Sequence, residues 1–265
     1  TKVTIYCCVT KICYIFNHVV LYFTIINMEI NINCDLGEKS KIHSNKNDPH
    51  LLNIVNSANV ACGYHAGDEE SMNQVVEISK KNGVSIGAHP SFKDLENFGR
   101  KRMNLSSLEI RDLIINQYEI LQKIADNHGE TVTHIKPHGA LNNMACEDME
   151  LASVIAKSIL EIDKNIIYLV PTGSKMEQSA KKLGMKIACE IFADRNYEDD
   201  GNLVSRKKPH ALITDPEEAK KHVLNMVKNQ SLNCHSGKQI PCEIDSVCIH
   251  GDNESSLSTA KSIRD

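Results

Sequence analysis

The stretch IGAHPSFKDLENFGRKR, residues 86–102, joins a short apolar run to a loop crowded with reactive side chains. The apolar run, residues 84–88, ends at His89 and Pro90, and the loop beyond holds two acids, two phenylalanines, a glycine and three consecutive cations at 100–102. A short apolar run bounded by turn residues is typical of a buried strand. A loop that only connected two elements would not need so many ionisable groups, so we expect this strand to end at a ligand site.

The same pattern, an apolar run followed by ionisable residues, recurs along the chain from Met28 onward. Seven apolar runs alternate with segments of helical spacing, at residues 29–36, 57–62, 84–88, 131–135, 166–170, 185–191 and 246–249. Helix signals lie between them, among them a capping box formed by Ser106 and Glu109. Alternating strands and helices imply a parallel sheet with helices outside it. Seven such units favour a closed α/β fold, a (βα)7 barrel resembling the TIM barrel, with a doubly wound open sheet as the competitor.

Composition and charge exclude several classes of function. The chain has 265 residues, of which 41% are hydrophobic and 24% charged, as in ordinary globular proteins. A net charge of −4 and 5% aromatic residues argue against a nucleic-acid partner. The ten cysteines show no regular spacing, which favours reduced thiols and a cytoplasmic location. The sequence also lacks the glycine motifs of P-loop and Rossmann nucleotide sites.

Residues 1–27 differ from the rest, being apolar, rich in cysteine and charged only at Lys2 and Lys11. Their longest apolar run is shorter than the roughly 20 residues of a membrane-spanning helix, and no small-residue cleavage site follows it. We therefore expect residues 1–27 to be an extension outside the fold, residues 28–265 to form a single barrel domain, and no membrane partner. A membrane anchor is the alternative for the extension.

Ionisable side chains end six of the seven predicted strands: Asp35, His65, His89, Lys136 with His138, Asp194 with Arg195, and His250 with Asp252. Taken singly, each is more simply a satisfied polar residue or a helix cap. Together, at the carboxyl ends of barrel strands, they would surround one pocket. Carboxylates and imidazoles there could exchange protons or bind a divalent metal, and nearby cations could hold a phosphate or carboxylate.

Six segments of the chain resemble the LamB/YcsF family. They are NCDLGE (33–38), NVACGYHAGD (59–68), GVSIGAHPSFKDLENFGRKRM (83–103), HIKPHGALNN (134–143), EIFADRNYEDDGNLVSR (190–206) and CIHGDN (248–253). The motifs are long and occur in order from Met28 almost to the C-terminus. One departure is Asn142, because the family usually has tyrosine there.

The resemblance implies a (βα)7-type barrel similar to glycoside hydrolase and deacetylase barrels. It also implies hydrolysis of 5-oxoproline to glutamate with ATP as co-substrate, Mg²⁺ accompanying the ATP, and two partner subunits, B and C. The catalytic positions carried over are Asp35, His65, His89, Lys136, His138, Asp194 and His250. The positions expected to bind substrate or ATP are Glu38, Asp68, Arg100, Arg195, Arg206 and Asp252, and a metal site on this chain stays open.

The chemistry of a lactam suits these residues. Its C–N bond is resonance-stabilised, so phosphorylation of the amide oxygen would activate it. Lys136 or Arg195 could then stabilise developing negative charge, and Asp35 or Asp194 with a histidine could activate water and protonate the nitrogen. Two alternatives are a metal-dependent carbohydrate or amide deacetylase built on Asp35 and histidines, and a non-catalytic scaffold for the partner subunits.

Overall fold

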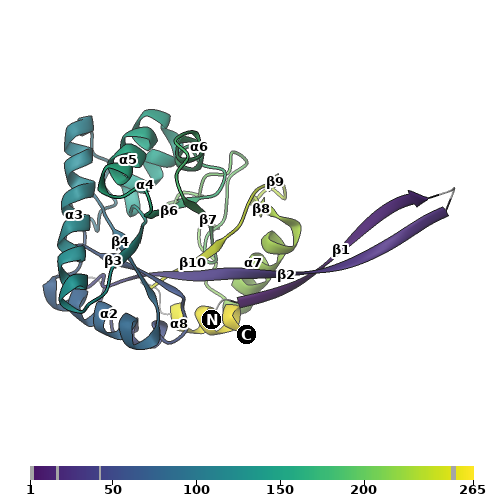
Figure 1. Ribbon diagram of the computed structural model, residues 1–265, viewed down its shortest axis with the longest axis horizontal. Helices are drawn as coiled ribbons and strands as arrows, with labels where there is room; N and C mark the ends of the chain where they lie inside the picture. The colour runs from purple at the N-terminus through teal and green to yellow at the C-terminus, as the bar shows by residue number, and fades with distance from the viewer. Residues whose placement is uncertain (1–2, 16–17, 42, 252–254) are drawn as a thin grey trace.

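The chain forms a closed barrel of seven parallel strands (Figure 1). The computed structural model describes residues 3–15, 18–41, 43–251 and 255–265, with side chains from residue 29 onward. The barrel strands, in sequence order, are β2 (His18–Leu36), β3 (Ser57–Ala61), β4 (Ser85–His89), β5 (Val132–Ile135), β6 (Ile167–Pro171), β7 (Ile187–Phe192) and β10 (Ser246–His250). Each pairs in parallel with the next, and β10 pairs with β2 to close the ring, so the closed barrel rather than the open sheet is confirmed.

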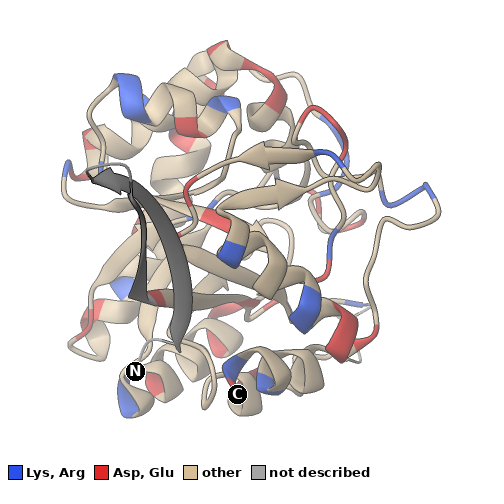
Figure 2. Cartoon of the chain, turned by 90° about the vertical axis from the view of Figure 1, so that its right-hand side faces the viewer, with Lys and Arg blue, Asp and Glu red and all other residues tan. Residues whose placement is uncertain are grey.

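Helices lie outside the barrel, as the alternating pattern predicts. They are α1 (Asp48–Leu51), α2 (Glu69–Asn82), α3 (Ser107–Asn127), α4 (Gly139–Glu147), α5 (Met149–Ile162), α6 (Lys175–Lys182), α7 (Pro216–Asn229) and α8 (Ser256–Arg264). The predicted capping box of Ser106 and Glu109 opens α3. Lys and Arg residues are interspersed with Asp and Glu over the outer helices and loops (Figure 2). No helix in the described part of the chain has the length and apolar character needed to cross a membrane.

In the described part of the chain, three further strands lie outside the barrel. β1 (Val3–Ile15) pairs antiparallel with the first part of β2, from Val3 opposite Ile30 to Ile15 opposite His18. β8 (Ser231–Asn233) and β9 (Gln239–Pro241) form a small hairpin. The expectation that residues 1–27 lie outside the fold stays a prediction.

Two elements of the structure were not predicted from the sequence patterns. Helix α4 gives no start signal, because its N-cap residue, His138, makes no side-chain cap hydrogen bond. The β8–β9 hairpin gives a weak strand signal, because its strands have only three residues each.

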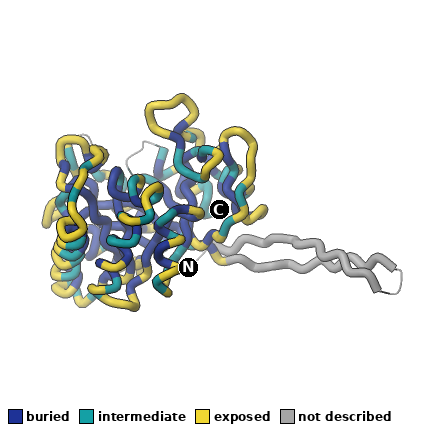
Figure 3. The backbone as a smooth tube through the Cα atoms, turned by 90° about the horizontal axis from the view of Figure 1, so that it is seen from above, coloured by how far each residue is buried: buried dark blue, intermediate teal, exposed yellow. Residues whose placement is uncertain are grey.

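The hydrophobic core fills the space between barrel and helices, and the buried residues, dark blue in Figure 3, lie inside an outer layer of exposed ones. The barrel interior differs, because polar side chains from β2, β3, β5 and β7 meet there. Gly87 of β4 makes room for one of them: a Cβ atom at this position would lie 2.2 Å from the ring of His134. This polar interior forms the floor beneath the candidate site.

Candidate active site

Asp35 and Lys136 form a buried ion pair at the carboxyl ends of β2 and β5. Lys136 Nζ lies 2.8 Å from Asp35 Oδ1, and the two residues are 2% and 4% exposed. Burial alone would lower the pKa of the Lys136 ammonium, but the negative charge of Asp35 holds that pKa well above its usual value. Burial would likewise raise the pKa of Asp35, yet His89 and Lys136 hold it well below the usual range. The pair is therefore charged, with a cation fixed at the centre of the barrel mouth.

A network of amides and carboxylates holds this pair from below. Lys136 Nζ also contacts Glu190 Oε2 at 3.3 Å and donates to Cys248 Sγ at 2.9 Å, so several groups share its three protons. Asn59 Nδ2 donates to Asp35 Oδ1 at 2.8 Å. Burial raises the pKa of Glu190, with Lys136 opposing the shift. Because Asp35 is the closer and more acidic partner of the lysine, Glu190 is the carboxyl group that more readily keeps a proton.

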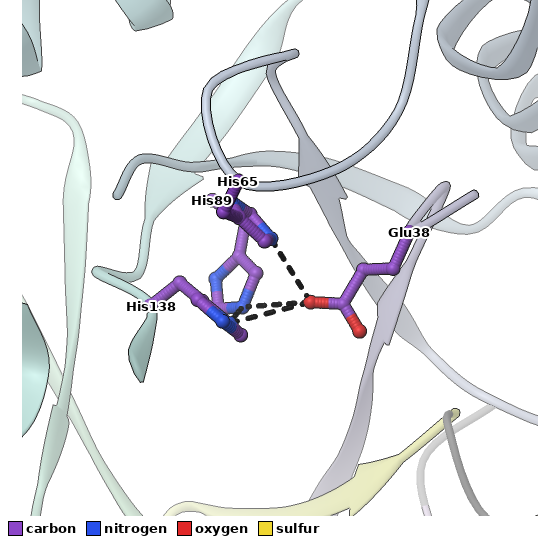
Figure 4. A group of neighbouring side chains, drawn as sticks. All are labelled: Glu38, His65, His89 and His138. Atoms are coloured by element: carbon purple, nitrogen blue, oxygen red, sulfur yellow. Dashed lines mark hydrogen bonds and ion pairs between the residues drawn. The ribbon is translucent and has the colours of Figure 1, made fainter. Parts of the chain in front are cut away.

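Glu38 and three histidines form a second group beside Asp35 (Figure 4). His65 Nε2 lies 3.1 Å from Glu38 Oε1, and His138 Nδ1 lies 3.3 Å from the same oxygen. His89 Nε2 is 3.8 Å from that oxygen and 3.3 Å from Asp35 Oδ2. The four residues, which we call the histidine cluster, are 0–8% exposed. Burial lowers the pKa values of His65 and His138 well below the usual range for histidine.

The loop after β4 is shaped to support this cluster. Phe98 and Gly99 both have left-handed backbone, with φ of 56° and 66°. The Phe98 carbonyl oxygen lies 3.0 Å from His138 Nε2, so it accepts a hydrogen bond from that nitrogen. A Cβ atom at residue 99 would lie 2.9 Å from atoms of both His65 and His138. Left-handed backbone in a non-glycine residue is uncommon and is retained where the surroundings require it. The quoted loop is thus a wall of the site.

Asp194 and His250 form an acid–imidazole pair at the ends of β7 and β10. His250 Nδ1 lies 2.8 Å from Asp194 Oδ1 and 3.0 Å from Oδ2. His250 and Phe192 stack with their ring centroids 5.5 Å apart. Burial would raise the pKa of Asp194, but His250 lowers it below the usual value. One atom from each of Asp35, Cys248 and His250 lies within 4.8 Å of the others, so this pair borders the buried ion pair.

The structure therefore gathers eight of the predicted residues around one barrel mouth: Asp35, Glu38, His65, His89, Lys136, His138, Asp194 and His250. Arg195 lies beside Asp194, but its guanidinium donates to the backbone oxygens of Val204 and Ala211 at 2.7 and 3.3 Å. Its observed contacts thus hold the loop after β7. Burial, followed by the charge of Arg206, lowers the pKa of Arg195 to about 10.

The other predicted positions have different surroundings. Asp68 is exposed, caps α2 through the Ser71 backbone and lies 3.3 Å from Lys39 Nζ. Arg206 is exposed in the loop after β7. The guanidinium of Arg100 lies 4.9 Å from the centroid of the Phe98 ring, at the edge of the histidine cluster. Asp252 lies outside the described residues.

Sequence reasoning missed the residues of the floor, namely Asn33, Asn59, His134, Glu190 and Cys248. They are at most 5% exposed and come from five strands, β2, β3, β5, β7 and β10. Asn59 Nδ2 donates to Asn33 Oδ1 at 2.8 Å, and His134 Nε2 lies 3.0 Å from Asn59 Oδ1. Burial lowers the pKa of His134 to about 4. The available signal was a polar residue inside an otherwise apolar strand, which in a closed barrel must find its partners inside.

Comparison with known proteins supports one family. The LamB/YcsF family model matches residues 30–265. The A subunit of 5-oxoprolinase from Rhodopseudomonas palustris is 44% identical over 238 residues, covering 89% of this chain and 94% of the relative. The protein of the same name from Staphylococcus aureus strain RF122 is 43% identical, covering 90% and 95%. A solved lactam utilization protein from Thermus thermophilus is 34% identical, with a TM-score of 0.82 and coverage of 89% and 95%. The chain belongs to the LamB/YcsF family.

Proposed function

We propose that this chain is the lactam-cleaving component of an ATP-dependent 5-oxoprolinase, which hydrolyses 5-oxo-L-proline to L-glutamate together with two partner subunits, B and C. The observation that carries the proposal is the buried Lys136–Asp35 pair next to the Asp194–His250 pair at one barrel mouth. Relatives named as the A subunit of 5-oxoprolinase and as a lactam utilization protein point to the same substrate class. We also propose a cytoplasmic location, in keeping with the free thiols of the seven described cysteines.

The proposed reaction has three stages. The γ-phosphoryl group of ATP is transferred to the lactam oxygen, releasing ADP with Mg²⁺ accompanying the nucleotide. Water then adds to the activated carbon and loses a proton, and the C–N bond breaks as the ring nitrogen takes up a proton. The resulting acyl phosphate is hydrolysed by a second water to glutamate and phosphate. Proton transfer and charge stabilisation at the ring are the tasks that fall to this chain.

The Asp194–His250 pair suits the proton transfers. A carboxylate can only accept a hydrogen bond, so the Nδ1 atom of His250 carries the proton and Nε2 is the basic nitrogen. His250 is 15% exposed at its side chain, so it can reach a substrate at the mouth. We assign it the role of base toward water and then of acid toward the ring nitrogen.

Lys136 suits stabilisation of the negative charge that the phosphorylated lactam oxygen carries while the ring opens. Its ammonium is held by Asp35 at 2.8 Å and sits in a site with little water, where a fixed cation acts strongly. We assign the substrate carboxylate to Arg100, because its guanidinium lies at the edge of the same mouth.

The test is release of glutamate from 5-oxoproline by the full chain, with and without ATP and with and without the B and C subunits. We expect turnover only when all are present. Asp194→Asn and Lys136→Met should lower it by about 100-fold or more. Glu161→Gln is the matched control, because Glu161 is an exposed carboxylate paired with Arg111 on the outer helices. Near-normal turnover in both site variants would refute the assignment, and amide hydrolysis without ATP would favour the metal-dependent hydrolase instead.

A further inference from the structure

The histidine cluster has no task in the proposed proton transfers, although its four members are almost completely buried. Their donor atoms converge closely: one ligand-capable atom from each of Glu38, His65, His89 and His138 lies within 4.8 Å of all the others. The residues come from the ends of β2, β3, β4 and β5, four neighbouring strands of the barrel. Figure 4 shows the imidazoles turned toward one carboxylate oxygen.

We propose that Glu38, His65, His89 and His138 bind one divalent transition-metal ion of the zinc class. The separations between the donor atoms suit such an ion: 3.1, 3.3 and 3.8 Å from Glu38 Oε1 to the three histidines, and 3.0 Å between His89 Nε2 and His138 Nδ1. In a tetrahedral zinc site with ligand bonds of about 2.0–2.1 Å, neighbouring donor atoms lie about 3.3–3.4 Å apart. The cluster therefore has the dimensions of a set of ligands around one ion.

The hydrogen bonds behind two of the rings fix which nitrogens face the centre. His89 Nδ1 lies 2.7 Å from the Lys136 carbonyl oxygen, and His138 Nε2 lies 3.0 Å from the Phe98 carbonyl oxygen. A carbonyl oxygen only accepts hydrogen bonds, so each of these nitrogens carries a proton. In the neutral rings, His89 Nε2 and His138 Nδ1 are then both lone-pair donors, and they face each other at 3.0 Å.

Two lone pairs and a carboxylate oxygen meeting in a buried space repel one another unless a cation lies between them. Carbonyl oxygens that orient ligand histidines from behind in this way are the usual support of protein metal sites. Three imidazoles with one carboxylate favour zinc or a similar transition metal over Mg²⁺ or Ca²⁺, which prefer oxygen ligands. The site is independent of the proposed lactam reaction, since it rests on geometry alone. A single proton shared by His89 and His138 is the rival occupant.

The experiment is metal binding by the full chain, after removal of bound metal with a chelator. Equilibrium dialysis against Zn²⁺ should give one ion per chain, and Co²⁺ in its place should give the intense visible absorption of tetrahedral coordination. Glu38→Gln and His138→Ala should each weaken binding on the order of 100-fold or more. Far-UV circular dichroism establishes that each variant is folded, and Glu38→Gln keeps the size of the side chain should the alanine variant fail to fold.

His250→Ala is the matched control, because it removes an imidazole from the adjoining group of Asp35, Cys248 and His250 and leaves the histidine cluster intact. It should bind Zn²⁺ as the natural sequence does. Absence of saturable Zn²⁺ binding would overturn the proposal and leave a proton as the occupant. Loss of binding in His250→Ala with retention in Glu38→Gln would also overturn it. Neither result depends on 5-oxoproline turnover.

Discussion

Replacement of Lys136 by methionine tests how much the buried ion pair contributes to stability as well as to catalysis. Methionine keeps an unbranched chain of similar length but removes the charge that lies 2.8 Å from Asp35 and 3.3 Å from Glu190. Both carboxyl groups are at most 4% exposed, so the variant leaves them buried without their cation. Breaking a buried ion pair by removing one partner costs about 3–5 kcal/mol. We expect the free energy of unfolding at pH 7 to fall by that amount.

A double variant tests the reason for this loss. Lys136→Met with Glu190→Gln replaces the second buried carboxyl group that loses its cation by a neutral amide, while Asp35 keeps its bond from Asn59 at 2.8 Å. We expect it to recover about half of the lost stability, on the order of 2 kcal/mol. Turnover should not recover, because no cation is restored to the barrel mouth. Comparison of the single and the double variant therefore distinguishes the effect on stability from the effect on turnover.

Urea unfolding followed by circular dichroism gives the stabilities, and glutamate release gives the turnover. Lys181→Met is the control: the Lys181 side chain is 46% exposed and pairs with Glu177 and with the exposed Glu243, so its loss should cost less than about 1 kcal/mol. A free energy of unfolding for Lys136→Met within about 1 kcal/mol of that of the natural sequence would refute this explanation. A double variant no more stable than Lys136→Met alone would refute it as well.

Three further outcomes follow from single positions. Gly99→Ala should lower the free energy of unfolding in urea by about 2–4 kcal/mol. Gly83 has the same φ of 66° but no atom within 4 Å of an added Cβ, so Gly83→Ala should lower it by only about 1 kcal/mol. Equal losses in the two variants would contradict the packing argument. Ser106→Ala removes the cap of α3 and should lower stability by about 1 kcal/mol, with no change in glutamate release. Burial raises the pKa of Asp48 to about 7, so the folded chain keeps a proton that the unfolded chain releases near pH 4. The free energy of unfolding should therefore fall as the pH rises from about 4 to about 7. Asp48→Asn should remove this dependence of stability on pH, and an unchanged dependence would refute the role of Asp48.

The strand ends could be predicted because two signals coincide there. Apolar runs mark the strands, and a polar or charged residue directly after the run marks the carboxyl end of the strand, as at His89 and His250. Parallel topology then brings those ends to one rim, and no knowledge of particular contacts is needed. For this reason the rim residues were found, while their individual partners were not.

The floor could not be predicted because its contacts depend on closure of the ring. Asn33 donates to Glu190 across 157 residues of sequence, and Lys136 donates to Cys248 across 112. Within one strand, such a residue looks like any polar position facing solvent. Arg195 has contacts that its charge alone does not predict. Its charge suggested a substrate contact, but a long loop returns and offers the carbonyl oxygens of Val204 and Ala211 to its guanidinium.

A buried polar floor is a costly way to fill a barrel, so its purpose is positional. Replacing such a network by apolar side chains would often be neutral or stabilising, since buried ion pairs rarely repay their desolvation. An apolar interior, however, would give Lys136 no reason to keep its charge or its place. The amides of Asn33 and Asn59, together with Glu190, restrict the ammonium to one point beneath Asp35. Electrostatic catalysis requires this restriction, because a fixed charge need not reorganise as the reaction proceeds. The Lys136 and Glu190 variants therefore test both the energetic cost of the floor and its use.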